Sequence, residues 1–322
     1  MNRKKRSTVF GAALIIFGIL GGLCLGILLE DSQMQQSWPR LPGNGATKPN
    51  QTLPTHVPAG PAEAGITFSA SDTKKISLRY GDGCTYRPDA EELLMRPLAW
   101  DLTGEEPKVL ILHTHGSESY TRQPGDKYKE TTQFRTLDTG YNMVAVGEKL
   151  ASLLEEAGIS VVQDCQIHDY PSYNSAYTNS RQSVQDYLKR YPSIQVVLDL
   201  HRDAVLNADG SQYAPTVTVK GETVAQLMLV VGTDASGMLH PRWEENLAAA
   251  LKMQVLLERQ VAGITRPTIL RAQRFNHDLS DGAMIVEIGT AGNSLQQAMA
   301  AVPYLAEALI ALCGGTTANS TS

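Results

Sequence analysis

The chain has 322 residues, of which 42% are hydrophobic and 19% are charged, a composition typical of a globular protein. That length accommodates one large domain or two smaller ones. The formal net charge of −5 leaves no polybasic footprint beyond the first few residues, so nucleic acid is excluded as an expected partner.

The amino-terminal segment predicts a membrane anchor. Basic residues at positions 3–6 precede an uncharged stretch at residues 7–29. Its apolar part is long enough for one membrane-spanning helix, which takes about 20 residues. A cleaved signal peptide is the alternative, but residues 26–30 offer no good small-x-small cleavage site. Because basic residues stay on the cytoplasmic side, we expect a single-pass cell-membrane protein with a cytoplasmic tail at residues 1–6 and an extracytoplasmic main domain.

Two segments follow the predicted anchor before the main domain begins. Residues 30–64 are rich in Pro, Gln, Gly, Asn and Thr and poor in apolar residues, which predicts a flexible linker. Residues 65–106 form a leading subregion that we expect to pack on the main domain. It contains possible short strands at residues 66–68 and 76–80 and a helix start at residues 88–94, where Pro, Asp and Glu occupy the first turn.

Residues 107–315 alternate between strand and helix patterns, and the polar tail at 316–322 is expected to be disordered. This alternation predicts an α/β fold with a mostly parallel, twisted sheet and helices on both faces. A hairpin at residues 216–231 is expected to join the sheet. The predicted strands are residues 109–112, 159–162, 194–200, 268–271 and 283–286, and the predicted helices are residues 141–157, 174–191, 241–261 and 294–312.

Three of the predicted strands end in residues that bind metals or move protons. The first runs into His113, His115 and Glu118, the second into His201, and the third into Glu287. Ligands of parallel sheets bind at the carboxyl ends of the strands. The sequence therefore predicts one site that combines histidines and carboxylates.

Two histidines and a carboxylate are a common catalytic zinc shell that leaves a fourth position for water. His115 and Glu118 have an H-x-x-E spacing, and His201 supplies a second imidazole from another strand. Zinc lowers the pKa of its bound water and polarises a carbonyl. A further carboxylate must then carry the water's proton to the leaving group. Glu287 suits this role because a carboxylate in so apolar a run is costly without a function or a partner.

Each of these residues also has an ordinary structural explanation. His201 alone fits a hydrogen-bonded histidine at a strand end. Glu118 alone fits a helix cap or a partner of Arg122 or Arg135. Glu287 alone fits a buried partner of Arg202 or Arg274. All of these explanations must hold together while all four residues sit at strand ends, and that coincidence favours a functional site. His168 follows a strand too, so it is a candidate fourth ligand or substrate-binding residue.

Four motifs occur along the main domain. They are Leu-His-Thr-His-Gly-Ser-Glu-Ser-Tyr at 112–120, His168-Asp169-Tyr170 with Tyr173-Asn174, Asp-Leu-His-Arg-Asp-Ala at 199–204, and Val-Glu-Ile-Gly at 286–289 with Asn293. Together they resemble the stage II sporulation protein P family, whose members are membrane-anchored cell-wall hydrolases of endospore formers. The resemblance covers about residues 109–312, and the predicted anchor and linker fit it as well.

The family is similar in fold to the zinc N-acetylmuramoyl-L-alanine amidases, in which His, Glu and His hold zinc and a late Glu is the base. This resemblance implies that His115, Glu118 and His201 bind one zinc ion and that Glu287 is the catalytic base. The ligand Glu lies farther along the chain in the wider amidase group, so Glu130 is the fallback. Residues expected to bind substrate or support the ligands are His113, whose role is open, His168, Arg202 and Asp203, and Arg135 and Arg181 are further candidates for the carboxylates of stem peptides.

The resemblance implies hydrolysis of the amide between N-acetylmuramic acid and L-alanine in peptidoglycan during spore engulfment. The family is also associated with cutting peptide cross-links. The implied partners are peptidoglycan, stage II sporulation protein D and a membrane-embedded engulfment complex. Two alternatives stay open, namely a non-catalytic wall-binding scaffold and a zinc carboxypeptidase, in which H-x-x-E also occurs.

Overall fold

The computed structural model describes residues 66–102 and 104–314. The predicted cytoplasmic tail, membrane anchor, linker and carboxyl-terminal tail lie outside the described residues. The boundary between the leading subregion and the main domain stays a prediction.

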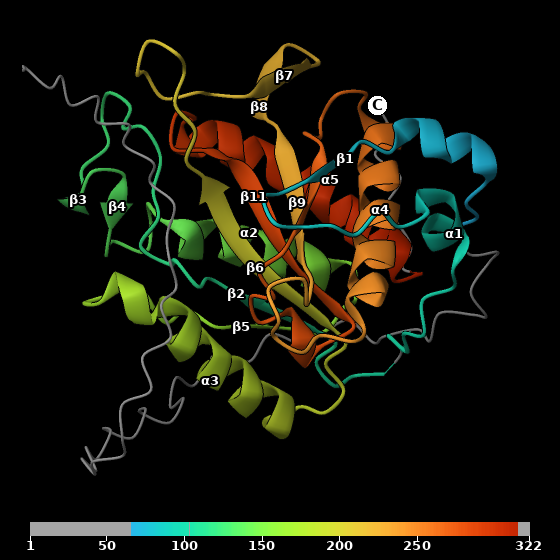
Figure 1. Ribbon diagram of the computed structural model, residues 1–322. Coiled ribbons are helices and arrows are strands. Elements are labelled where there is room, and N and C mark those ends of the chain that lie inside the picture. Colours follow the sequence, from blue (N-terminus) through green and yellow to red (C-terminus); the bar gives the residue numbers. More distant parts are fainter. Residues whose placement is uncertain (1–65, 103, 315–322) are drawn as a thin grey trace, which may run out of the picture. The chain divides into compact units, whose positions relative to one another are not determined.

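A seven-stranded sheet forms the centre of the described fold (Figure 1). Five of its six strand junctions are parallel, and β9 against β11 is the antiparallel one. These junctions confirm the prediction of a mostly parallel α/β sheet. The strands lie in the order β1 (Leu78–Tyr80), β10 (Thr268–Arg271), β9 (Leu227–Gly232), β11 (Gly282–Thr290), β6 (Val196–Asp203), β2 (Val109–Leu112) and β5 (Val161–Gln163).

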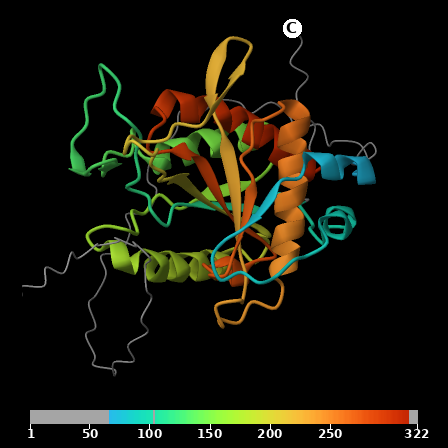
Figure 2. The ribbon, with the colours of Figure 1, turned by 45° about the horizontal axis from the view of Figure 1, so that its top comes forward.

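Helices cover both faces of the sheet, as the sequence predicted. On one face, α2 (Met143–Glu156), α4 (Trp243–Gln260) and α5 (Leu295–Leu312) bury the larger core. On the other, α3 (Ala176–Arg190) packs against side chains of β2 and β6. Figure 2 shows α3 and α5 on opposite sides of the sheet. The part of this second face formed by β9, β10 and β11 carries a small cluster of Met228, Val230 and Ile285.

Local signals read from the sequence mark the helix ends. The Asn142 side chain accepts a hydrogen bond from the Val144 amide at the start of α2, and Gly158 follows the end of α2 with a φ of 84°. Ser294 and Gln297 form a capping box at the start of α5. Of the described helices, α5 alone is long and apolar enough to match a membrane span, but it packs against α2 and α4 as a core helix does.

Several predicted elements differ from the structure. Residues 66–68 are not a strand, whereas the predicted helix start at residues 88–94 is confirmed by the short helix α1 (Ala90–Met95). The predicted hairpin divides, because β7 (Thr216–Val219) and β8 (Glu222–Ala225) form a separate ribbon, whereas β9 enters the main sheet. The burial patterns explain this division, since β7 alternates between exposed and half-buried residues whereas all six residues of β9 are buried. A second ribbon, β3 (Glu130–Thr132) with β4 (Arg135–Thr136), was not predicted.

An ion pair ties the leading subregion to α4. Asp72 lies in a short 3-10 helix at Ala70–Lys75 and accepts hydrogen bonds from Arg259 Nη2 at 2.7 Å and Nε at 3.2 Å. These bonds from Arg259 lower the pKa of the Asp72 carboxyl from 3.8 to about 2. A lowered folded-state pKa stabilises the fold at any pH above the unfolded value and loses that effect as the pH falls from about 4 to 2.

We therefore expect Asp72→Asn to lower the free energy of unfolding by about 1 kcal/mol at pH 7, the typical value for a partly exposed pair of good geometry. The difference from the unchanged chain should shrink below pH 4. Thermal unfolding followed between pH 7 and pH 3 measures both quantities, with the turn variant Asp82→Asn as the matched control. A difference that stays constant across this range would contradict the assigned role of the pair.

Candidate functional site

His201 and Glu287 lie side by side near the carboxyl ends of β6 and β11. Successive side chains of a strand point to opposite faces. Leu200 and Val286 belong to the core under α2, α4 and α5, so His201 and Glu287 point to the other face. The register pairs these two residues as Cα partners on adjacent parallel strands. Both strands continue past them, to Asp203 and Thr290, so the residues lie within strands and not after their ends as predicted.

The loop after β2 brings His115 to the same place. Its ring stacks on Tyr173 with a centroid distance of 4.4 Å and meets the edge of Tyr177. The ring of His201 lies 5.4 Å away, nearly perpendicular to that of His115. The Nδ1 atom of His115 lies 3.7 Å from Asp169 Oδ2, which is beyond hydrogen-bond distance. Aromatic packing thus fixes the imidazole and leaves Nδ1 without a hydrogen-bond partner.

Glu118 lies in the same group but already has cationic partners. Its Oε1 atom lies 3.3 Å from Arg135 and 3.4 Å from Arg202, and its Oε2 accepts a hydrogen bond from the Arg202 backbone amide at 3.2 Å. Its Oε2 is 3.5 Å from His201 Nδ1. Burial alone raises the pKa of this carboxyl, but the charges of Arg202 and His201 outweigh it and hold the pKa well below its usual range. Glu118 is therefore an ionised carboxylate whose charge is largely neutralised.

Glu287 differs from Glu118 because no ion pair holds it within the described residues. Its side chain is partly exposed, yet its Oε2 atom is buried and has no hydrogen-bond partner. Burial raises the pKa of Glu287 to about 8, and Asp203 and Glu118 add to the effect while His201 and Arg266 oppose it. The alternative role as a partner of Arg202 or Arg274 is not seen. A carboxyl group in this state suits the holding and transfer of a proton near neutral pH.

The donor chemistry of the group fits a divalent metal such as zinc. In the part of the chain that the structure describes, no three His, Cys, Asp or Glu side chains already converge as metal ligands. However, His115 Nδ1 is buried without a hydrogen-bond partner, which is costly unless a ligand satisfies it, and His201 Nδ1 lies 3.5 Å from Glu118 Oε2. Two imidazoles beside a carboxylate are a zinc donor set. Because two guanidinium groups hold Glu118, the two histidines are the more available donors.

Asp199, which was not predicted as a site residue, lies directly beside His201. Asp199 Oδ1 is 3.0 Å from His201 Nε2, although not in hydrogen-bond geometry, and both oxygens accept hydrogen bonds from Thr114. The His201 ring thus lies between Asp199 and Glu118, with one carboxylate at each nitrogen. Burial raises the pKa of Asp199, but His201 and Thr114 outweigh burial and lower it to about 2. The spacing of two residues on one strand was a signal that could have found Asp199.

The other predicted residues do not join the group formed by His115, Glu118, His201 and Glu287. His113 is fully buried on the α2 side of the sheet, where its ring packs under Gly147 and its Nε2 contacts Gln163 at 3.0 Å. His168 pairs with Asp164 at 2.9 Å. The fallback residue Glu130 accepts a hydrogen bond from the Phe134 amide in its own hairpin.

Three predicted substrate-binding arginines are committed to protein groups. Arg202 donates to the carbonyls of Ser119 and Phe134 besides contacting Glu118, so it anchors the loop that carries the site. Arg135 contacts Asp169 at 2.5 Å as well as Glu118. Arg181 makes two hydrogen bonds of 2.8 Å to Asp278. These contacts leave little of the three guanidinium groups for a ligand.

Comparisons with known proteins agree with the motifs. Stage II sporulation protein P of Bacillus subtilis (strain 168) is 29% identical over 206 residues, which are 61% of this chain and 48% of that protein. The chain thus matches about half the length of this curated relative.

Solved structures similar to this chain include two amidases. N-acetylmuramoyl-L-alanine amidase AmiC2 of Nostoc punctiforme has a TM-score of 0.39 at 11% identity, covering 64% of this chain and 97% of that chain. The catalytic domain of CwlV, an amidase from Bacillus (Paenibacillus) polymyxa var. colistinus, has a TM-score of 0.39 at 10% identity, covering 63% and 96%. Scores below 0.5 do not establish a shared fold. The profile of the stage II sporulation protein P family, in contrast, matches residues 48–310 of this sequence, so the chain belongs to that family.

Proposed function

We propose that this protein is a zinc-dependent N-acetylmuramoyl-L-alanine amidase that hydrolyses peptidoglycan. The observation that carries the proposal is the juxtaposition of two buried imidazoles, of which His115 has an unpartnered Nδ1, with a carboxyl group, Glu287, that has no ion-pair partner. Hydrolysis of an amide needs an activated water, a polarised carbonyl and a group that moves a proton to the departing amine. The side chains near the carboxyl ends of β2, β6 and β11 match those three needs.

His115 and His201 would hold the ion, with Glu118 as the third, weaker ligand. When bound, zinc would polarise the lactyl carbonyl and acidify the attacking water. Glu287 takes the proton from that water and delivers it to the amine of L-alanine as the amide bond breaks. Tyr173 keeps the His115 ring in place by stacking, and Arg202 keeps Glu118 beside His201.

Membership of the family supports a role in sporulation. The proposal includes the predicted anchor at residues 7–29, an extracytoplasmic catalytic domain, action during spore engulfment, and an assembly with stage II sporulation protein D. Cleavage of peptide cross-links is included as a second reaction, since both reactions break an amide by attack of water.

Release of peptides from purified cell-wall sacculi tests the proposal. We expect the protein to solubilise stem peptides and a chelator to stop the release until zinc is restored. A wall-binding scaffold would instead sediment with sacculi without releasing product. A zinc carboxypeptidase would release single terminal amino acids and leave the muramoyl–alanine bond intact.

Asp199 is expected to orient His201 for metal binding. Carboxylates that contact the second nitrogen of a metal-binding histidine typically contribute about 10- to 100-fold to metal affinity. We therefore expect Asp199→Asn to weaken zinc binding by about that factor while the protein stays folded. Competitive titration against a zinc indicator measures the affinity, and circular dichroism measures folding. The surface variant Asp186→Asn is the control, and equal affinities for the two variants would contradict this role of Asp199.

A further inference from the structure

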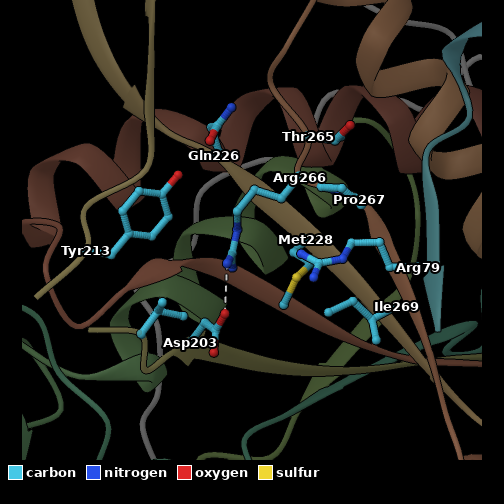
Figure 3. A pocket seen from close by; sticks show the side chains of 10 residues that line it. Arg79, Asp203, Tyr213, Gln226, Met228, Thr265, Arg266, Pro267 and Ile269 are labelled. Carbon is cyan, nitrogen blue, oxygen red and sulfur yellow. Dashed lines mark hydrogen bonds and ion pairs between the residues drawn. The ribbon is translucent and has the colours of Figure 1, made fainter. Parts of the chain in front are cut away.

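A pocket of about 430 Å³ opens on the same face of the sheet, beside Glu287. Figure 3 shows its side chains, with the guanidinium groups of Arg79 and Arg266 both directed into the hollow. No residue of the motifs that define the proposed zinc site lines it except Asp203. The lining residues are Arg79, Asp203, Val205, Tyr213, Gln226, Met228, Thr265, Arg266, Pro267 and Ile269.

Strand register places this pocket next to the proposed catalytic carboxyl group. Met228 on β9 is the Cα partner of Glu287 on the neighbouring strand β11. Asp203, at the end of β6, is the partner of Thr290 in the same strand as Glu287. The charges of Asp203 and Arg266 are close enough to act on the Glu287 carboxyl. A ligand group bound in the pocket therefore lies close to Glu287, as a part of the substrate of Glu287 would.

The charged side chains of the pocket leave an excess of positive charge. Arg266 Nη1 contacts Asp203 Oδ2 at 2.8 Å, while its Nε and Nη2 atoms are buried without hydrogen-bond partners. Buried donors of this kind are costly unless a ligand accepts from them. Arg79 is exposed and makes no ion pair within the described residues. Two guanidinium groups and one carboxylate give the pocket a formal charge of +1, which a single carboxylate neutralises.

The remaining wall of the pocket has an apolar part and a polar part, the latter formed by Tyr213, Gln226 and Thr265. Met228, Pro267 and Ile269 form the apolar part beside the arginines (Figure 3). The volume is in the range of small-molecule sites and holds one or two amino-acid residues of a peptide. The pocket thus combines a surface for an alkyl chain with donors for a carboxylate, the two parts of an amino acid that bears an acidic group.

We propose that this pocket binds a free carboxylate of the stem peptide through Arg79 and Arg266 and thereby selects the peptide that is cut. The proposal rests on the proposed amidase function and assigns its substrate subsite to arginines that differ from the predicted Arg135, Arg181 and Arg202. Guanidinium groups bind carboxylates with paired, charge-assisted hydrogen bonds. An amide in place of the carboxylate loses this charge pairing.

The test compares disaccharide–peptide substrates with free carboxylates against the same substrates with those carboxylates converted to amides. For the unchanged full-length protein we expect kcat/KM to be about 10- to 100-fold higher with the free carboxylates, the range for a hydrogen-bonded charge pair. Arg79→Gln should bring this ratio toward one, mainly through KM, and Arg266→Lys, which keeps the charge but loses the paired donors, should lower the ratio. Arg271→Gln, an exposed arginine at the other end of β10, is the matched control and should keep the ratio.

Binding of the free stem peptide, carboxylate against amide, is measured in parallel by fluorescence anisotropy. If the unchanged protein hydrolyses neither substrate, the amidase function fails, and the binding ratio still decides whether the pocket prefers a carboxylate. If hydrolysis occurs but Arg79→Gln and Arg266→Lys keep the same preference as Arg271→Gln, the pocket proposal is wrong and the amidase function stands.

Discussion

Replacing Glu287 by Gln is expected to lower kcat for amide hydrolysis by about 10²- to 10⁴-fold, the usual contribution of a positioned acid–base group. Glutamine keeps the size of the side chain but neither takes nor gives a proton. The ratio is measured with a disaccharide–peptide substrate under saturating conditions. The surface variant Glu307→Gln on α5 should retain full activity, and a Glu287→Gln variant with the same activity would contradict the assigned role.

The same variant should make the metal-free protein more stable at alkaline pH. Burial raises the pKa of Glu287 from 4.5 to about 8, so the native state resists ionisation that the unfolded state undergoes freely. The destabilisation is absent below about pH 4.5, where both states are neutral, and grows until the pH passes 8. We expect Glu287→Gln to be more stable by up to about 4–5 kcal/mol at pH 8.5 and equal to the unchanged chain at pH 4.

Chemical denaturation in the presence of a chelator at these two pH values measures the gain in the free energy of unfolding. A gain in stability together with a loss of activity is the mark of a residue retained for function at the expense of the fold. A variant that loses activity because it is unstable at both pH values would show instead that Glu287 serves the structure.

The second large effect concerns the two imidazoles. We expect His115→Ala and His201→Ala each to weaken zinc binding by at least about 100-fold, since each removes one of three ligands from a small donor set. Glu118→Gln should cost less than either, because Arg135 and Arg202 already neutralise that carboxylate. His168→Ala is the matched control, since His168 is a buried histidine that pairs with Asp164 away from the group.

Zinc titration of the folded variants gives the affinities, with activity as a separate measurement. The order His115 and His201 first, Glu118 next and His168 without effect supports the proposed ligand set. Loss of zinc in His168→Ala equal to that in His201→Ala would contradict it.

The sequence predicted the β2, β6 and β11 strands and the helices well because each has a strong local signal. Apolar β-branched runs, the Gly158 stop and the Ser294 cap depend on residues close together in the chain. The antiparallel entry of β9 between β10 and β11 has no such signal, since six apolar residues fit either direction equally well. The continuation of β6 and β11 past His201 and Glu287 depends on pairing with neighbouring strands.

The roles of the arginines were the least predictable part of the site. Arg135 and Arg202 are near the predicted ligands in the sequence, yet both serve Glu118 and the loop around it. Arg79 and Arg266 come from segments far apart in the chain and meet only because β1, β10 and β9 are neighbours in the sheet. The sequence shows which charged residues are present, but only the fold shows which of their charges are already neutralised by a partner.

The proposed reaction at the carboxyl ends of β6 and β11 is the zinc-dependent hydrolysis of the bond between N-acetylmuramic acid and L-alanine. Mass spectrometry of a defined disaccharide–peptide after incubation with the protein tests it most directly. We expect a free lactyl-bearing disaccharide and an intact peptide with a new amino terminus on L-alanine, formed only when zinc is present. An unchanged substrate, or cleavage elsewhere in the peptide while the muramoyl–alanine bond survives, would contradict it.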